Sequence, residues 1–253
     1  MGRVIAVANQ KGGVGKTTTV INLSAYLADV GKRVLVVDID PQGNTTTGLG
    51  IDKKRVESSM YDVLLGSEPV MEALVPTEVV GLHLVPATID LAGADIELAG
   101  VSGRETLLKT AIQDIRGRYD YVFIDCPPSL GLLTLNALTA ADAVMIPMQC
   151  EFFALEGLSQ LLSTIELVRE RLNSGLVLEG VVLTMYDGRT NLAAQVAEEV
   201  RKHFTDKVYR SVIPRAIRLS EAPSHGQPIL RYDPKSRGAE GYRMLAEEVV
   251  AHG

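Results

Sequence analysis

The chain has 253 residues, of which 46% are hydrophobic and 22% charged, and its net charge of −6 excludes a protein that is basic throughout. This size predicts one globular domain over residues 1–253, and the absence of any apolar run of 18 residues argues against a membrane-spanning helix. A strand expected at the N-terminus leaves no room for a signal peptide, and two scattered cysteines form no disulfide framework, so we expect a cytoplasmic protein.

The first predicted strand, residues 4–8, leads directly into a glycine-rich turn. This turn occupies residues 10–18, and apolar residues then recur at helical spacing until Gly31. Backbone N–H groups at a helix start lack intrahelical partners and favour an anion, and glycine lets a phosphate approach them closely. Lys16 would reach the β- and γ-phosphates, and the Thr17 hydroxyl would ligate Mg²⁺. We therefore predict ATP binding by Gly12, Gly13, Val14, Gly15, Lys16, Thr17 and Thr18.

Strands and helices are expected to alternate along the rest of the chain. Residues 33–38 read as a strand that ends in a polar loop over 39–46. Residues 51–81 are less regular, with a short helix over Met60–Leu65 capped by Ser58 and a second helix opened by Pro69. Further strands are predicted at 82–86, 119–125, 143–147 and 177–183, and helices at 89–99, 103–116, 130–140, 154–172 and 191–204. The pattern predicts a three-layer, doubly wound α/β fold: a mostly parallel sheet with helices on both faces.

Two carboxylates follow strands of this predicted sheet. Asp125 closes an apolar strand, so it would surface beside the phosphate loop and hold Mg²⁺ directly or through water; a turn-capping role is the alternative. Asp40 lies in the polar loop after the second strand, where a carboxylate could orient the water that attacks the γ-phosphate. Asp38 would help at the metal or the loop, or simply end its strand.

Three motifs resemble those of the ParA/MinD group of P-loop ATPases, and of its ParA/Soj branch in particular. Lys11 adds a second lysine to the phosphate loop, as in the family's deviant Walker A box K-G-G-x-G-K-T. Residues 38–42 match D-x-D-P-Q, and residues 125–131 match D-x-P-P-S-x-G. The resemblance implies an ATP-sandwich homodimer in which Lys11 contacts the partner's nucleotide. It assigns catalysis to Lys11, Lys16 and Asp40.

The base and DNA sites are expected from the later part of the chain. Residues 213–223 are similar to the ParA/Soj stretch that passes the adenine, with the Pro214 backbone reading the base and Met185 packing on the ring; plain core is the alternative for Met185. Residues 201–243 carry ten Lys or Arg against four acids, a net +6 that leaves −12 on the remainder. By resemblance, Arg189 and Arg218 hold double-stranded DNA without sequence preference; surface salt bridges are the alternative.

The resemblance implies a slow, Mg²⁺-dependent ATPase that binds DNA as its ATP-bound dimer. A ParB/Spo0J-type partner would stimulate hydrolysis, and the output would be chromosome segregation, with replication initiation as a further target, in a nucleoid-associated protein. A MinD-like membrane-positioning ATPase is the alternative. Residues 244–253 are acidic and short, whereas a membrane-binding helix needs basic and bulky apolar residues, so no stable membrane attachment is expected. The cysteine spacing also disfavours an iron–sulfur cluster.

Overall fold

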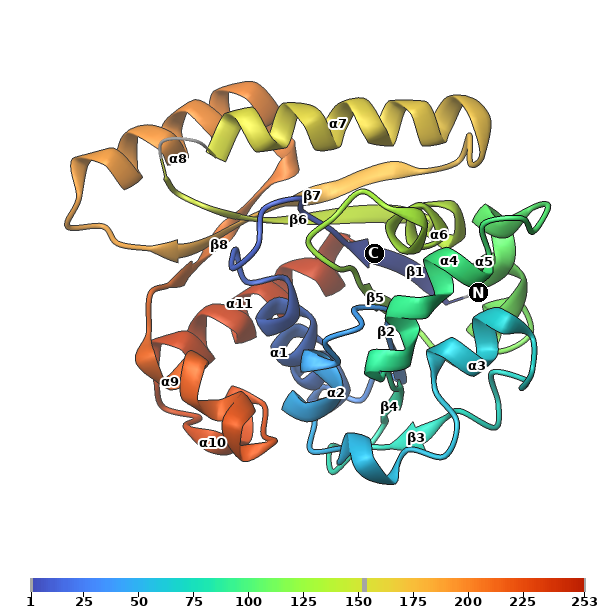
Figure 1. Ribbon diagram of the computed structural model, residues 1–253. Coiled ribbons are helices and arrows are strands. Elements are labelled where there is room, and N and C mark those ends of the chain that lie inside the picture. Colours follow the sequence, from blue (N-terminus) through green and yellow to red (C-terminus); the bar gives the residue numbers. More distant parts are fainter. Residues whose placement is uncertain (1, 152–153, 253) are drawn as a thin grey trace.

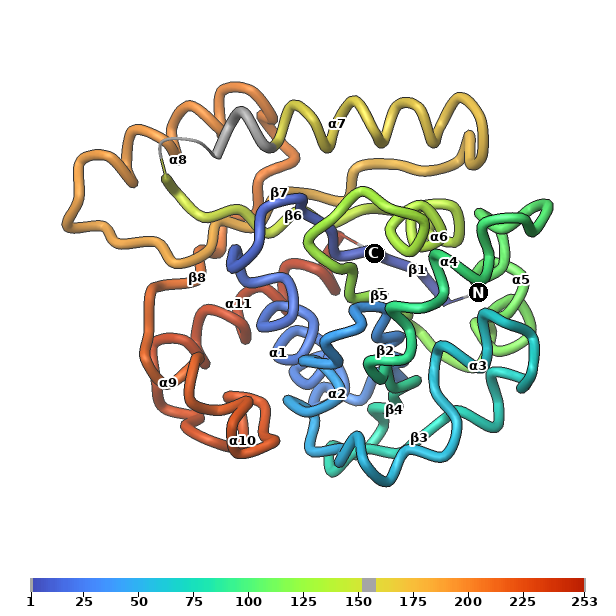
Figure 2. Tube along the Cα trace, viewed as in Figure 1, coloured from blue at the N-terminus to red at the C-terminus, as the bar shows by residue number. Residues whose placement is uncertain are grey.

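A computed structural model describes residues 2–151 and 154–252, except for the side chains of 154–157 (Figures 1 and 2). Within these residues eight strands form one sheet in the order β3-β4-β2-β5-β1-β6-β7-β8. Only β3 pairs antiparallel with its neighbour. The strands are β1 Arg3–Val7, β2 Val34–Asp38, β3 Val75–Pro76, β4 Leu82–Val85, β5 Tyr121–Asp125, β6 Ala143–Gln149, β7 Val177–Tyr186 and β8 Val208–Pro214.

Helices cover both faces of the sheet because side chains alternate across each strand. Val4 and Ala6 of β1 join one core cluster, whereas Ile5 and Val7 join the other. The first cluster lies under α3 Met60–Leu65, α4 Ala94–Glu97, α5 Leu107–Ile112, α6 Leu132–Ala140, α7 Ala154–Arg171 and α8 Asn191–Phe204. The second lies under α1 Lys16–Asp29, α9 Ile217–Glu221, α10 Ile229–Tyr232 and α11 Arg237–His252. Figure 1 shows the resulting three layers, so the predicted fold class is confirmed.

Several local predictions are corrected. The cap of α3 is Ser59 rather than Ser58: the Ser59 hydroxyl accepts from the Tyr61 amide, and Asp62 accepts from the Ser59 amide in a capping box. Pro69 opens a hydrogen-bonded turn rather than a helix. The predicted helices at 89–99 and 103–116 are broken into short α and 3-10 pieces. The 3-10 turns of the chain are Lys53–Arg55, Ile89–Gly93, Arg104–Thr106, Arg116–Arg118, Thr205–Lys207 and Ala222–His225.

Six helices and strands were not predicted, and four of them contribute residues to the site. The six are α2, β3, β8, α9, α10 and α11, of which α2, β8, α9 and α11 line the two nucleotide cavities described below. Strand β8 lies in the basic segment, where its alternation of buried Tyr209, Ser211 and Ile213 with exposed or half-buried residues is partly hidden by charge. Helix α2, Asn44–Gly48, lies in the loop predicted to be irregular. Among the helices of the described ranges, none combines the length and the apolar character that crossing a membrane requires.

Candidate functional site

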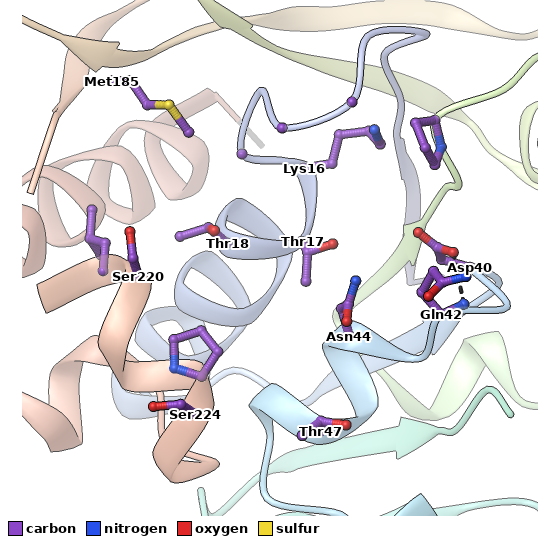
Figure 3. Close-up of a pocket in the computed structure, with 16 residues that line it drawn as sticks. Lys16, Thr17, Thr18, Asp40, Gln42, Asn44, Thr47, Met185, Ser220 and Ser224 are labelled. Carbon is purple, nitrogen blue, oxygen red and sulfur yellow. Dashed lines mark hydrogen bonds between the residues drawn. The ribbon is translucent and has the colours of Figure 1, made fainter. Parts of the chain in front are cut away.

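A cavity of about 600 Å³ opens at the carboxyl ends of the central strands, the usual ligand position in a doubly wound sheet. It lies between the phosphate loop and α1 on one side and α2 and the α9 region on the other (Figure 3). Residues predicted from three separate segments of the sequence meet there. These are Gly12, Gly13, Gly15, Lys16, Thr17, Thr18, Asp40 and Met185.

The phosphate loop leaves the start of α1 open to an anion. Gly15 is the N-cap with a φ of 91°, in the left-handed region that glycine adopts freely, and no side chain caps the helix. The first amides of α1 therefore remain available to a ligand. Asn9 anchors the loop, because its side chain donates to the Pro147 carbonyl (2.8 Å) and accepts from the Lys11 amide (3.0 Å). The Val14 side chain is buried, so at this position only the backbone can face a phosphate.

Lys16 is held inside the site. Its side chain is buried, and its amine donates to the Lys11 carbonyl at 3.4 Å. Burial lowers the pKa of Lys16, and the nearby Asp125 carboxylate opposes that shift. A buried ammonium with one long hydrogen bond is poorly satisfied until an anion arrives. The arrangement therefore suits a phosphate oxygen.

Asp125 and Thr17, the predicted metal ligands, are in direct contact. The Thr17 hydroxyl donates to Asp125 Oδ2 at 2.8 Å, and the Thr45 hydroxyl donates to the same oxygen at 2.6 Å. Asp125 Oδ1 is buried and has no hydrogen-bond partner among the described residues. Burial raises the pKa of Asp125, and the hydrogen bonds from Thr45 and Thr17 and the charge of Lys16 oppose that shift. These oxygens fit Mg²⁺, which prefers few protein ligands plus water and phosphate.

Asp38 organises the loop that carries Asp40. Its Oδ2 accepts from the Thr46 amide (2.9 Å) and hydroxyl (2.7 Å), and its Oδ1 accepts from the Asp40 amide (3.2 Å). Thr46 Oγ1 in turn accepts from the Ala87 amide at 3.0 Å. Complete burial raises the pKa of Asp38, and the neighbouring Asp125 carboxylate adds to that shift. These hydrogen bonds hold Asp38 within the loop over residues 39–46, and its function stays a prediction.

Asp40 faces the cavity from this loop. One of its oxygens, Oδ1, accepts from the Gln42 amide at 3.0 Å, as drawn in Figure 3. Oδ2 makes no hydrogen bond within the described part of the chain, which leaves it available to a water molecule. Figure 3 shows Asp40 and Lys16 bordering the same cavity, with Asn44 between Asp40 and Thr17. A carboxylate held in this way can orient water beside a bound terminal phosphate.

Lys11 does not line this cavity. Its amine pairs with Glu151 Oε2 at 2.7 Å, and the side chains of Lys11 and Glu151 are 42% and 44% exposed. The Gln149 amide holds the other Glu151 oxygen. Within one chain, therefore, the two lysines of the loop lie in different places: Lys16 borders the cavity, and Lys11 lies outside it.

The base end is a second cavity of about 170 Å³ that shares Gly15, Thr18 and Met185 with the first. Pro214 lines it, so the two residues predicted for the adenine are brought together. Met185 has a φ of 50°, an unusual backbone for a residue other than glycine and one that tends to occur at functional sites. The assignment of Met185 and Pro214 to the adenine stays a prediction. The cavity that both residues line suits a flat ring.

The two arginines predicted for DNA are both paired with carboxylates of their own chain. Arg189 makes two hydrogen bonds to Asp187, at 2.7 and 2.8 Å, although its side chain is 90% exposed. Arg218 pairs with Glu221 at 2.9 Å and with Asp233 at 3.6 Å. The salt bridges named as the alternative are therefore present, and DNA binding stays a prediction for both arginines.

Sequence reasoning missed several groups of the site. Thr45, Asn44 and Thr47 bring helix α2 to the metal and phosphate side, and Gln42 contributes from the loop before it. A helix of five residues gives no periodic signal, and the run of Thr and Asn after Gly43 was the available hint. At the base end, Leu219 and Ser220 line both cavities and Tyr242 lines the smaller one. These residues reach the site only through the packing of α9 and α11.

Comparisons with known proteins match the sequence and the fold of this chain. Residues 2–178 match the protein-family model described as an AAA domain. The chain is 62% identical over 253 residues to the sporulation initiation inhibitor protein Soj of Bacillus subtilis, covering 100% of both chains. It is 51% identical over 251 residues to the chromosome-partitioning ATPase Soj of Treponema pallidum, covering 99% and 98%. A solved Mycobacterium smegmatis structure named cobyrinic acid a,c-diamide synthase, with bound ADP and magnesium, is 44% identical with a TM-score of 0.86, covering 100% and 95%.

Proposed function

The chain belongs to the ParA/Soj family of chromosome-partitioning ATPases, and on that premise we propose that its ATP-bound form is a homodimer that binds DNA without sequence preference. Its cofactors are ATP and magnesium, as in the related nucleotide-bound structures. A ParB/Spo0J-type protein is the proposed partner that stimulates hydrolysis and so releases the dimer. The proposed location is the nucleoid in the cytoplasm, and residues 1–253 are proposed to act as one ATPase domain.

One observation supports the proposed dimer: the two lysines of one loop lie in different places. Lys16 borders the chain's own cavity, whereas Lys11 lies outside it in an exposed pair with Glu151. An exposed ion pair contributes at most about 1 kcal/mol, so a phosphate on another molecule can replace the carboxylate at little cost. Lys11 is therefore available to a partner's nucleotide, and each site is completed by the other protomer.

The chain's own residues account for the steps of hydrolysis. The first amides of α1 and the Lys16 ammonium hold the phosphates, and Thr17 with Asp125 holds Mg²⁺, which neutralises phosphate charge when it is bound. Asp40 orients the attacking water through its free oxygen. Asp38 and Thr46 keep the Asp40 loop in position. Positioning and charge stabilisation are the main requirements of phosphoryl transfer, and these groups supply both.

DNA binding by the dimer follows from charge and valency. The excess of basic over acidic residues in one protomer lies in residues 201–243 of an otherwise acidic chain, and pairing two protomers doubles the number of phosphates that they can contact. The bound nucleotide would then control the affinity of the protein for chromosomal DNA. Membrane association, the alternative, predicts instead that the ATP form binds anionic vesicles.

The deciding experiment is a salt-titrated DNA-binding assay with ATP, with ADP and without nucleotide, on the wild type and on Asp40→Ala. We expect binding only with ATP, a steep loss of affinity with salt, and persistent binding by the variant, because it does not hydrolyse ATP. Sedimentation with ATP and Mg²⁺ should show a dimer under the same conditions. A protein that stays monomeric, or that binds DNA equally well without ATP, contradicts the proposal.

A further inference from the structure

A third cavity, of about 620 Å³, lies beside the base end of the nucleotide site and is lined by three arginines. Arg189 comes from the turn after β7, Arg215 follows β8, and Arg237 begins α11. Figure 1 shows these elements on one side of the molecule, where β7 and β8 end. Arg237 shares the hollow with Glu240, Gly241 and Met244, spacings that place one face of α11 along its wall. We name it the arginine hollow.

Arg215 and Arg237 differ from Arg189 and Arg218 because neither forms an ion pair with a carboxylate, although the charge of Arg215 contributes to lowering the pKa of Asp187. Both are exposed, and neither side chain forms a hydrogen bond or ion pair within the part of the chain that the structure describes. By contrast, Arg189 is tied to Asp187, and Arg218 lies outside the hollow in pairs of its own. Exposed guanidinium groups without a partner suit the oxygens of a phosphate, which arginine binds in a bidentate manner.

The two carboxylates of the hollow do not cancel its charge. Asp187 is occupied by Arg189, and that pairing holds the pKa of Asp187 far below its usual range. Glu240 is 3.9 Å from Arg243, at the limit of an ion pair, and it lies on the exposed side of α11. The three arginines therefore leave an excess of positive charge in the hollow, in a chain whose overall charge is −6.

Arg215 also borders the nucleotide site. It lines the base cavity together with Pro214 and Ala216, and its amide donates to the Tyr186 carbonyl at 3.2 Å. Arg215 thus lines both the base cavity and the arginine hollow. A base that packs against residues 214–216 would fix the segment from which Arg215 extends.

We infer that the arginine hollow binds backbone phosphates of duplex DNA through Arg215 and Arg237, with Arg189 at its edge, and that Arg215 links occupancy of the base cavity to this contact. The inference rests on the proposed DNA-binding function and names residues beyond Arg189 and Arg218 for it. Phosphate contacts of this kind hold any sequence equally, because they read no base edge. The contact is made by each protomer of the dimer.

The test compares Arg215→Ala and Arg237→Ala with the wild type, with Arg237→Lys and with Arg171→Ala, using a 30-base-pair duplex of arbitrary sequence with ATP and Mg²⁺. Arg171 is an exposed arginine that ends α7, on the opposite side of the molecule from the turn after β7 (Figure 1). Each alanine variant loses two phosphate contacts per dimer, so the slope of log affinity against log salt should fall by about 1.8. We expect a loss of at least about tenfold in affinity, with most of it restored by Arg237→Lys and none caused by Arg171→Ala.

The outcomes separate this inference from the function on which it rests. If the wild type binds DNA and both alanine variants bind it with the same affinity and salt slope, the inference that the arginine hollow binds DNA is overturned, and the proposed function stands. Wild type that does not bind DNA at all overturns both. If the wild type binds phosphatidylglycerol vesicles instead of DNA, and the alanine variants lose that binding, the hollow is a membrane site and the inference is overturned. Displacement of the DNA by millimolar inorganic phosphate at constant ionic strength would also overturn it.

Discussion

The phosphate end of the nucleotide cavity and the exposed rim of the molecule use the same kinds of side chain in opposite ways. At the phosphate end Lys16, Asp38 and Asp125 are buried, and the two carboxylates are bonded to groups of their own chain. At the rim Lys11 and Arg189 are exposed and paired with single carboxylates. Burial makes the first set rigid and costly to disturb, whereas water screens the second set.

This contrast separates the groups proposed to act within one chain from those proposed to contact a second molecule. Buried polar groups are positioned before the ligand arrives, which is what catalysis by positioning requires. In the proposed function, a phosphate of the second molecule replaces the carboxylate in each of these weak surface pairs. Changes at the buried end should therefore cause large losses in the isolated protein, and changes at the rim should be small until the protein associates.

The largest effect is expected for Lys16→Ala. Its charge-assisted contacts to two phosphates are each expected to contribute about 1.5–3 kcal/mol, so ATP affinity should fall by at least about 100-fold. Isothermal calorimetry measures the loss, with Lys54→Ala as the control because Lys54 is an exposed lysine away from the cavity. ATP affinity within threefold of the wild type would remove Lys16 from the site.

Asp40→Ala should reduce turnover by at least about 100-fold while ATP binding is retained, because only the positioning of the water is lost. Release of phosphate in single-turnover experiments measures the chemical step. The control is Asp52→Ala, an exposed aspartate that caps a 3-10 turn. A variant with normal turnover would show that another group orients the water.

Asp38→Asn should change the pH dependence of stability. Burial raises the pKa of Asp38, so between its ordinary value and the raised value the native state binds more protons than the unfolded state. Wild-type stability relative to Asp38→Asn should therefore fall as pH rises through that window, by at most about 1.4 kcal/mol per pH unit. Urea unfolding without nucleotide or Mg²⁺, from pH 5 to pH 8, measures the difference. A difference that does not vary with pH contradicts an ionisable, buried Asp38.

The smallest effect is expected for Glu151→Ala, which changes one partner of an ion pair at the rim. Glu151→Ala frees Lys11 from an exposed pair worth about 0.2–1 kcal/mol, so dimer affinity should rise by no more than about fivefold. Sedimentation with ATP, in the Asp40→Ala background to prevent hydrolysis, measures the dimer, and Glu57→Ala serves as an exposed control. Lys11→Ala should abolish the dimer under the same conditions. Weaker dimerisation by Glu151→Ala would mean that Glu151 itself contributes to the interface.

Much of the site could be predicted because its signals are local. The strand, glycine turn and helix around Lys16 are contiguous, and Asp125 ends an apolar strand that is plain in the sequence. The errors have equally physical causes. Ser58 and Ser59 differ by one position, which only the observed cap distinguishes. Helix α2 is too short to show periodicity, and the alternation in β8 is hidden among charged residues.

The amino-acid sequence by itself predicted the α/β class and the phosphate loop and assigned Lys16, Asp40 and Asp125 to the site, because these signals depend on neighbours within a few positions. Tertiary structure alone decided that Thr45 donates to Asp125, that Glu151 holds Lys11, and that Arg215 lies between the base cavity and the arginine hollow. Each of these contacts joins segments far apart in the chain, and the order of strands in the sheet sets their meeting. A local pattern carries no information about that order.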